Sequence, residues 1–282
     1  MDSIKNKIIR VDFNSPSASV DLSTSLHNTG FAVVENHPIS SNLIDGVYQD
    51  WKDYFAGEDK HDDLFDLKDQ DGYFPYKSEN ASGSTEKDLK EFYHIYPWGR
   101  YPSTISKKTK DLYKELLGVG STLLSWIDKE TPSDIRSKFS MPLSDMINDC
   151  QNNLLRVINY PSLSGQENPG AIRAAAHCDI NLITVLVAGS QPGLQVMSKS
   201  GDWVDVKCDR RLIIVNNGDM LKECSGGYYP STVHRVVNPS QNSNLPRLSM
   251  PMFIHPRDEV VLSDRYTGGS YLEERLREIG LK

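Results

Sequence analysis

Residues 177–187 read His-Cys-Asp-Ile-Asn-Leu-Ile-Thr-Val-Leu-Val, and they join two side chains that metals favour to a buried strand. The run 182–187 is apolar and rich in β-branched residues, which is typical of a strand buried on both faces. In the extended chain just before it, His177 and Asp179 lie two residues apart. Their side chains therefore share one face and can bind one ion. Cys178, between them, points away from that ion, and we interpret it as a small core residue.

Six further runs of the same character lie on either side of this stretch, separated by clusters of Gly, Pro, Asn and Asp. They are residues 154–160, 194–197, 203–206, 212–215, 232–237 and 248–254. Short strands punctuated by turn formers are typical of a β-sandwich or barrel. Within this series, Asn216-Asn217-Gly218-Asp219 predicts a turn that closes two strands rather than a catalytic element.

The first half of the chain has a more mixed pattern. Strands are expected at residues 7–13 and 30–35, and helices through 22–27, from Ser40 or Ser41 to Gly57, and over 106–129. A last helix is expected over 270–279, with Gly280 as its stop. We therefore expect one structural unit in three parts: a helix-rich N-terminal region (1–130), a β-rich core (150–256) and a C-terminal helical part (257–282) that could cover the site.

Composition restricts the classes of function. The 282 residues suffice for one large β-structure with added helices. With 31 basic and 38 acidic residues the net charge is −7, which provides no basic field for nucleic acid. No apolar run approaches the roughly 20 residues of a membrane span. Residues 1–5 show no signal peptide, and the four cysteines form no CxxC pair. We expect a cytoplasmic protein with reduced thiols that binds neither nucleic acid nor membrane.

A second histidine completes a metal-binding set. His234 lies in another extended run, 231–237, and two His with one carboxylate form a facial triad typical of non-heme Fe(II) sites. Each histidine taken alone is explained equally well as a hydrogen-bonded core residue. His61-Asp62-Asp63 has the same spacing, but it lies in an acidic run outside any expected strand, so we interpret it as solvated surface.

A third element adds an anion site. Arg247 and Ser249 share one face at the start of the last strand, where a guanidinium beside a hydroxyl can bind a carboxylate. A buried arginine on an inner strand needs an anionic partner. Tyr160, at the end of the run 154–160, is a further candidate donor to that anion, although a tyrosine at the rim of the core is the simpler interpretation.

Taken together, these motifs resemble the isopenicillin N synthase-like family of Fe(II)/2-oxoglutarate-dependent oxygenases over nearly the whole chain. The resemblance implies that His177, Asp179 and His234 bind iron. It also implies that Arg247, Ser249 and Tyr160 bind the distal carboxylate of 2-oxoglutarate. The fold it implies is α+β with a mainly β core, a double-stranded β-helix (jelly-roll, cupin-like) with helices packed outside. Further motifs that carry the resemblance lie at residues 30–39, 88–92, 193–196, 215–220, 231–237 and 247–251.

The implied activity is dioxygenase chemistry with Fe(II), 2-oxoglutarate and O2, in which a small-molecule substrate is oxidised, in the simplest case hydroxylated, with release of succinate and CO2. Two alternatives stay open: an oxidase of the same family that needs no 2-oxoglutarate, and a non-catalytic metal-binding sensor. The sequence identifies neither the substrate nor the oligomeric state. Six side chains could enter a substrate pocket, although ordinary packing explains each more simply: Phe74, Tyr76, His94, Trp98, Arg100 and Arg173.

Overall fold

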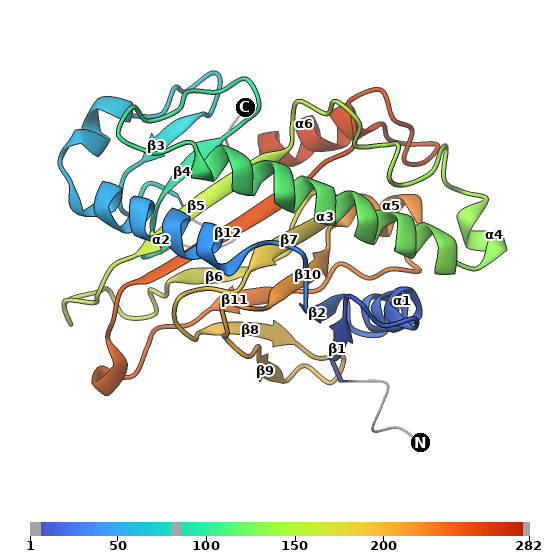
Figure 1. Ribbon diagram of the computed structural model, residues 1–282, viewed down its shortest axis with the longest axis horizontal. Coiled ribbons are helices and arrows are strands. Elements are labelled where there is room, and N and C mark those ends of the chain that lie inside the picture. The colour runs from blue at the N-terminus through green and yellow to red at the C-terminus, as the bar shows by residue number, and fades with distance from the viewer. Residues whose placement is uncertain (1–6, 80–85, 279–282) are drawn as a thin grey trace.

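Two β-sheets form the centre of the molecule in the computed structural model, which describes residues 7–79 and 86–278 (Figure 1). The large sheet has, in spatial order, β1 (Ile9–Asp12), β2 (Phe31–Glu35), β10 (Ile213–Asn217), β7 (Ile183–Val187), β12 (Arg247–Ile254), β5 (Leu154–Tyr160), β4 (Glu91–Ile95) and β3 (Gly72–Phe74). The small sheet has β6 (Ala174–His177), β11 (His234–Val236), β8 (Leu194–Met197) and β9 (Trp203–Asp205).

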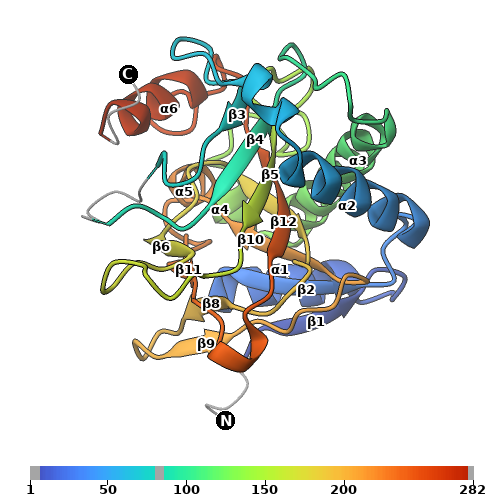
Figure 2. The same ribbon diagram turned by 90° about the vertical axis from the view of Figure 1, so that its left-hand side faces the viewer.

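From β5 onward the chain alternates between the two sheets, which produces the double-stranded β-helix. Strands β5, β7, β10 and β12 belong to the large sheet, whereas β6, β8, β9 and β11 belong to the small one. Figure 2 shows the small sheet on one side of β5 and β12, with α2 and α3 on the other side. The prediction of an α+β fold with a mainly β core and helices packed outside is confirmed.

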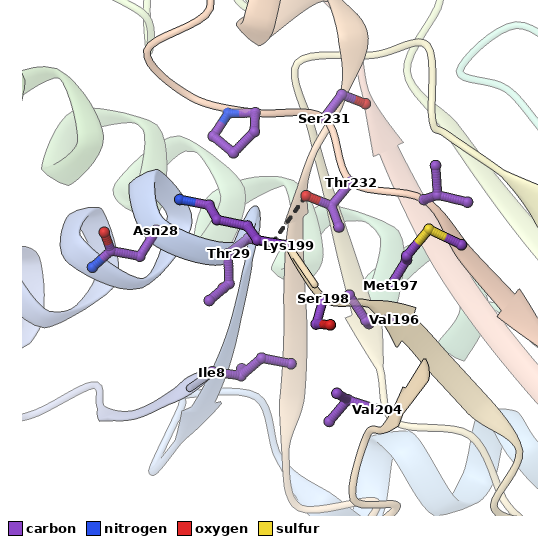
Figure 3. Close-up of a pocket in the computed structure, with 12 residues that line it drawn as sticks. Ile8, Asn28, Thr29, Val196, Met197, Ser198, Lys199, Val204, Ser231 and Thr232 are labelled. Atoms are coloured by element: carbon purple, nitrogen blue, oxygen red, sulfur yellow. Dashed lines mark hydrogen bonds between the residues drawn. The ribbon is translucent and has the colours of Figure 1, made fainter. Parts of the chain in front are cut away.

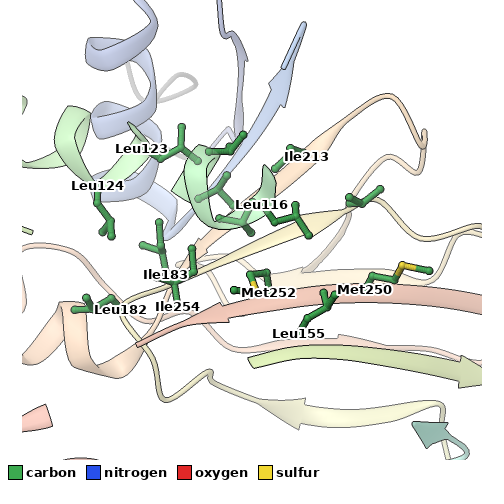
Figure 4. Packing of buried hydrophobic residues seen from close by; sticks show 14 of the residues in the cluster. Leu116, Leu123, Leu124, Leu155, Leu182, Ile183, Ile213, Met250, Met252 and Ile254 are labelled. Carbon is green, nitrogen blue, oxygen red and sulfur yellow. The ribbon is translucent and has the colours of Figure 1, made fainter. Parts of the chain in front are cut away.

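Helices cover the outer face of the large sheet. The longest, α3, contacts β7 and β12 and packs against α1 and α2. In Figure 4, Leu116 and Leu123 of this helix lie over Ile183, Met252 and Ile254 of the sheet. The helices are α1 (Ala18–Thr29), α2 (Ser41–Ala56), α3 (Lys108–Glu130), α4 (Ser133–Arg136), α5 (Asp219–Cys224) and α6 (Gly268–Glu278), with 3-10 turns at Asp59–Asp63 and Gln241–Ser243.

The inner face of the large sheet is buried as well. A second apolar cluster, which includes Phe31, Phe92, Ile158 and Leu186, fills the space between the two sheets. Strands β7 and β10 are therefore buried on both faces, and every residue of each strand is buried. This explains the continuous apolar runs in the sequence.

The prediction of a turn that closes two strands at Asn216–Asp219 is wrong. Asn216 and Asn217 end β10, Gly218 caps α5, and Asp219 begins that helix. The backbone N–H of Gly218 donates to the carbonyl of Leu182, and that of Asp219 donates to the carbonyl of Asp179. These bonds fasten the segment to residues 179–182 instead of folding it back into a hairpin.

Strands β3 and β4 were not foreseen, and β6 was expected only as extended chain at His177, without bounds. Strand β4 is completely buried although it contains Glu91 and His94, two polar residues that obscure its strand pattern. The N-terminal half thus adds four strands, β1 to β4, to the large sheet besides its helices.

The C-terminal helix forms as expected, although it begins at Gly268. Tyr271 of this helix packs against Tyr266, with 4.9 Å between ring centroids. Ile279 and Gly280, which were expected to end the helix, lie outside the described residues. Its role as a cover for the site stays a prediction. No helix in the described part of the chain is long and apolar enough to cross a membrane.

Candidate metal and cosubstrate site

Three of the predicted site residues converge where β6 and β11 meet. His177 ends β6 and His234 begins β11, and the two residues are direct partners in the antiparallel register. Asp179 follows two residues after His177. One ligand-type atom from each of the three lies within 4.8 Å of the others. The Oδ1 atom of Asp179 is 3.8 Å from His177 Nε2 and 3.6 Å from His234 Nε2.

The surrounding structure directs these atoms inward. Nδ1 of His177 contacts the carbonyl oxygen of Ala175 at 2.8 Å, and Nδ1 of His234 contacts that of Thr232 at 3.2 Å. A neutral imidazole that donates its Nδ1 proton to a carbonyl keeps a lone pair on Nε2, which is the form that binds metals. Both rings present Nε2 to the same point.

Asp179 uses its two oxygens differently. Oδ2 accepts hydrogen bonds from the Thr184 hydroxyl and from the Asn216 amide, the latter at 2.8 Å. Oδ1, in contrast, faces the two imidazoles. Thr184 on β7 and Asn216 on β10 are partners in the strand register, so the large sheet itself orients the carboxylate.

The electrostatics of the site favour a neutral His177 and an ionised Asp179. Burial, with a contribution from the nearby His234, lowers the pKa of His177 to about 4. Burial alone would raise the pKa of Asp179, but His234, His177 and the bonds from Thr184 and Asn216 outweigh it, so that this pKa is lowered. Two imidazoles and one carboxylate oxygen form a donor set that suits Fe(II).

The predicted anion-binding residues also come together, on the inner face of the large sheet. Arg247 is the register partner of Tyr160, and Ser249 is that of Ile158. The Arg247 guanidinium lies 5.2 Å from the centroid of the Tyr160 ring, and its Nε donates to the carbonyl of Gln191 at 2.9 Å. Its Nη1 is buried without a hydrogen-bond partner in the described residues, which fits a site for an anion.

The sequence alone did not indicate two groups of residues that shape the site. Thr184 and Asn216 orient Asp179, and Gly189 leaves room for Arg247, since a Cβ there would lie 2.5 Å from Nη2. An asparagine beside an apolar strand needs a hydrogen-bond partner when it is buried. This requirement is the sequence signal that could have indicated a role for Asn216. Gly189 gave no signal, because only the packing reveals the close approach.

The other candidates lie away from the triad or pack as ordinary residues. His61 is exposed in a 3-10 turn and faces Glu58. Trp98 is 48% exposed, and Arg100 pairs with Asp71 at 2.9 Å. Cys178 Sγ lies 3.9 Å from the carbonyl of Ser231.

The remaining candidates differ in their exposure. Tyr76 is 39% exposed, whereas Phe74, His94 and Arg173 are buried. The rings of Phe74 and Phe92, on neighbouring strands, are stacked with their centroids 4.5 Å apart, and the ring of His94 is tilted against that of Phe74 at the same centroid distance, 4.5 Å. Arg173 lies 5.9 Å from the Tyr160 ring, beside the predicted anion-binding residues.

A separate cavity of about 240 Å³ lies beside the triad, between β1, α1 and the small sheet (Figure 3). Thr232, two residues before His234, lines it and donates to the carbonyl of Thr29 at 2.9 Å. Its other lining residues include Val196, Met197 and Lys199. None of the six predicted site residues lines this cavity, so we place the metal site elsewhere.

Comparison with known proteins agrees with this arrangement. The model of the 2OG-Fe(II) oxygenase superfamily matches residues 152–256, and that of the non-haem dioxygenase in morphine synthesis N-terminal region matches residues 10–115. A structure described as "Putative oxygenase from Shewanella oneidensis" is 45% identical, with a TM-score of 0.88 and coverage of 98% of this chain and 100% of that one.

Two further relatives are more distant. A "putative 2OG-Fe(II) oxygenase family protein" from Caulobacter crescentus is 28% identical, with a TM-score of 0.79 and coverage of 97% of this chain and 99% of that one. Flavonol synthase 1 from Crocosmia x crocosmiiflora is also 28% identical, over 82% of this chain and 70% of its own length.

Proposed function

The chain belongs to the 2OG-Fe(II) oxygenase superfamily, and from this premise we propose that His177, Asp179 and His234 hold Fe(II). The enzyme is an oxidoreductase, a 2-oxoglutarate-dependent dioxygenase that uses Fe(II), 2-oxoglutarate and O2. The observation that carries the assignment is the convergence of Nε2, Nε2 and Oδ1 on one point, with every other polar atom of these side chains directed to protein partners.

We propose that Arg247, Ser249 and Tyr160 bind the distal carboxylate of 2-oxoglutarate. Arg247 is buried and offers an unpartnered Nη1, and Ser249 follows it on the same strand face. A carboxylate bound there would supply the anion that a buried guanidinium requires.

When bound, Fe(II) with 2-oxoglutarate and O2 supplies the oxidising chemistry, in which 2-oxoglutarate becomes succinate and CO2 and the substrate is oxidised. The protein contributes geometry and exclusion of water. His177, Asp179 and His234 would hold the ion from the protein side, and a set of only three protein ligands would leave room for 2-oxoglutarate and O2. The ring centroid of Phe31 is 5.5 Å from that of His234. Together with the inner apolar cluster, this ring is expected to exclude water from the space beside the triad.

We propose that the substrate is a small organic molecule and that its simplest product is the hydroxylated form. Flavonol synthase 1, by its name, makes such a small molecule. A buried charged group lies beside the triad: Lys90 pairs with Glu79 and with Asp88, each at 2.9 Å, and Asp88 accepts the N–H of Ala175. We expect the aromatic residues of the inner apolar cluster to contact an apolar part of the substrate.

We propose that the enzyme works in the cytoplasm and binds neither nucleic acid nor membrane. The four cysteines are all unpaired, which fits a reducing compartment. The acidic balance, with a net charge of −7, disfavours nucleic acid.

The first test uses three histidine substitutions, two at proposed ligands and one as a control. His177→Ala removes a ligand and is expected to abolish succinate formation from 2-oxoglutarate in the Fe(II)-loaded enzyme, and His234→Ala is expected to do the same. His61→Ala alters the other His-x-Asp sequence, which is exposed, and should retain wild-type turnover. Near-normal succinate production by His177→Ala would reject the triad. Oxygen consumption without any 2-oxoglutarate requirement would favour the oxidase alternative.

A further inference from the structure

A second arginine lies buried beside the proposed cosubstrate site. Arg173 precedes β6 and is only 1% exposed. One nitrogen, Nη2, donates to the carbonyl of Leu245 at 2.6 Å. Its Nε is buried and has no hydrogen-bond partner in the described residues. Burying a cation with an unsatisfied donor costs free energy of folding. A bound anion would offset this cost.

Arg173 and Arg247 approach the same aromatic ring. Their guanidinium carbons lie 5.9 Å and 5.2 Å from the centroid of Tyr160. The two cations are close enough to act on each other, because burial and then Arg247 lower the pKa of Arg173 to about 10. The hydrogen bonds of the two guanidiniums go to the backbone carbonyls of Leu245 and Gln191, and within residues 7–79 and 86–278 neither guanidinium forms an ion pair with a carboxylate.

Two buried cations without a protein anion constitute a site for an external one. Each presents one unpartnered nitrogen, Nε of Arg173 and Nη1 of Arg247. A carboxylate has two oxygens and can accept from two guanidiniums at once. We propose that Arg173 is a cosubstrate-binding residue that shares the distal carboxylate of 2-oxoglutarate with Arg247. This inference rests on the proposed function, since it deepens the assignment of the same subsite.

The test compares two 2-oxo acids in anaerobic, Fe(II)-loaded protein. Binding of 2-oxoglutarate and of 2-oxobutyrate, which lacks the distal carboxylate, is measured by calorimetry for wild type, Arg173→Met and Arg247→Met. We expect Arg173→Met to weaken 2-oxoglutarate about tenfold to a hundredfold, in the range of a lost charge-assisted hydrogen bond, and to leave 2-oxobutyrate unchanged. Arg173→Lys, which keeps the charge, should recover part of the loss.

Thermal unfolding of the ligand-free protein separates binding from a structural role. Removing a buried cation without an anionic partner should leave the Tm of Arg173→Met equal to or above that of wild type, while the Tm increase caused by 2-oxoglutarate becomes smaller. Arg173 could instead serve only to hydrogen-bond the carbonyl of Leu245. In that case Arg173→Met would lower the Tm of the ligand-free protein and leave the affinity for 2-oxoglutarate unchanged. This result would overturn the proposal.

The remaining outcomes are also decisive. Equal weakening of both 2-oxo acids would place Arg173 away from the distal carboxylate and would overturn the proposal. If Arg247→Met weakens 2-oxoglutarate and Arg173→Met does not, this inference fails and the proposed function stands. Wild-type protein that binds no 2-oxoglutarate would instead contradict the proposed function itself.

Discussion

At the scale of single residues, the two oxygens of Asp179 have different partners, and the proposed metal site depends on this difference. Oδ2 accepts hydrogen bonds from Thr184 and Asn216, which leaves Oδ1 for the proposed ion. Residues that orient a metal ligand raise both its affinity and its geometric precision, and their loss typically costs about 10–100-fold in metal binding. Asn216 is therefore as much a part of the proposed metal site as its ligands are.

Asn216→Ala is expected to weaken Fe(II) binding about tenfold, because the carboxylate loses one of the two bonds that fix its rotation. The control is Asn153→Ala, which removes another buried asparagine, one that accepts the N–H of His255 instead. Both variants should unfold at lower temperature, but only Asn216→Ala should bind less metal in an anaerobic competition titration. Equal metal affinity in the two variants would remove Asn216 from the site.

At the scale of elements, the contact between α3 and the large sheet fixes the layer that supports the site. Gly120 of this helix faces β12, and a Cβ there would be 2.0 Å from Cδ1 of Ile254. Gly118, two residues earlier in the same helix, has no neighbour within 4 Å of such a Cβ. Alanine at Gly120 would change both packing and helix propensity, whereas alanine at Gly118 would change helix propensity alone. Comparing the two substitutions therefore isolates the effect of packing.

We expect Gly120→Ala to lower the free energy of unfolding by about 1–3 kcal/mol through overpacking, less the helix-propensity gain. Gly118→Ala should instead raise it by up to ~1 kcal/mol, since alanine favours the helix and meets nothing. Urea unfolding of both variants measures the difference. Stabilisation by both substitutions would show that α3 can shift freely on the sheet.

The strands also show which parts of the fold can be predicted from the sequence. Strands β5 and β8 lie at their predicted bounds because apolar runs end sharply at turn formers. Strand β4 was missed because Glu91 is buried with its own partners, the hydroxyl of Tyr73 and Lys60, and local pattern cannot reveal such long-range pairing. The roles of Asn216 and Arg173 depend likewise on contacts between sheets and across strands.

At the scale of the whole molecule, buried histidines couple stability to pH. Burial lowers the pKa of His94 to about 3 and those of His177 and His255 to about 4, from an ordinary value near 6.5. As the pH falls below 6.5, these histidines bind protons in the unfolded chain but stay neutral in the folded chain. The free energy of unfolding is therefore greatest above pH 7 and falls as the pH drops toward 4.

Urea unfolding of metal-free protein should show a lower midpoint at pH 5.5 than at pH 7.5, with a loss on the order of 1 kcal/mol for each of these histidines. His255→Asn removes one of the three groups and should reduce this pH dependence by about a third. A midpoint that does not change between pH 7.5 and pH 5.5 would contradict the neutral, buried state of these rings.

The central claim, that the triad holds iron and that Arg247 binds 2-oxoglutarate beside it, is tested most directly by one titration. 2-Oxoglutarate is added anaerobically to Fe(II)-loaded protein while the visible metal-to-ligand charge-transfer band is recorded. We predict a saturable band in wild type, no band in Asp179→Ala and a band that needs far more 2-oxoglutarate in Arg247→Ala. Wild-type protein that demonstrably carries iron and develops no band would contradict the account.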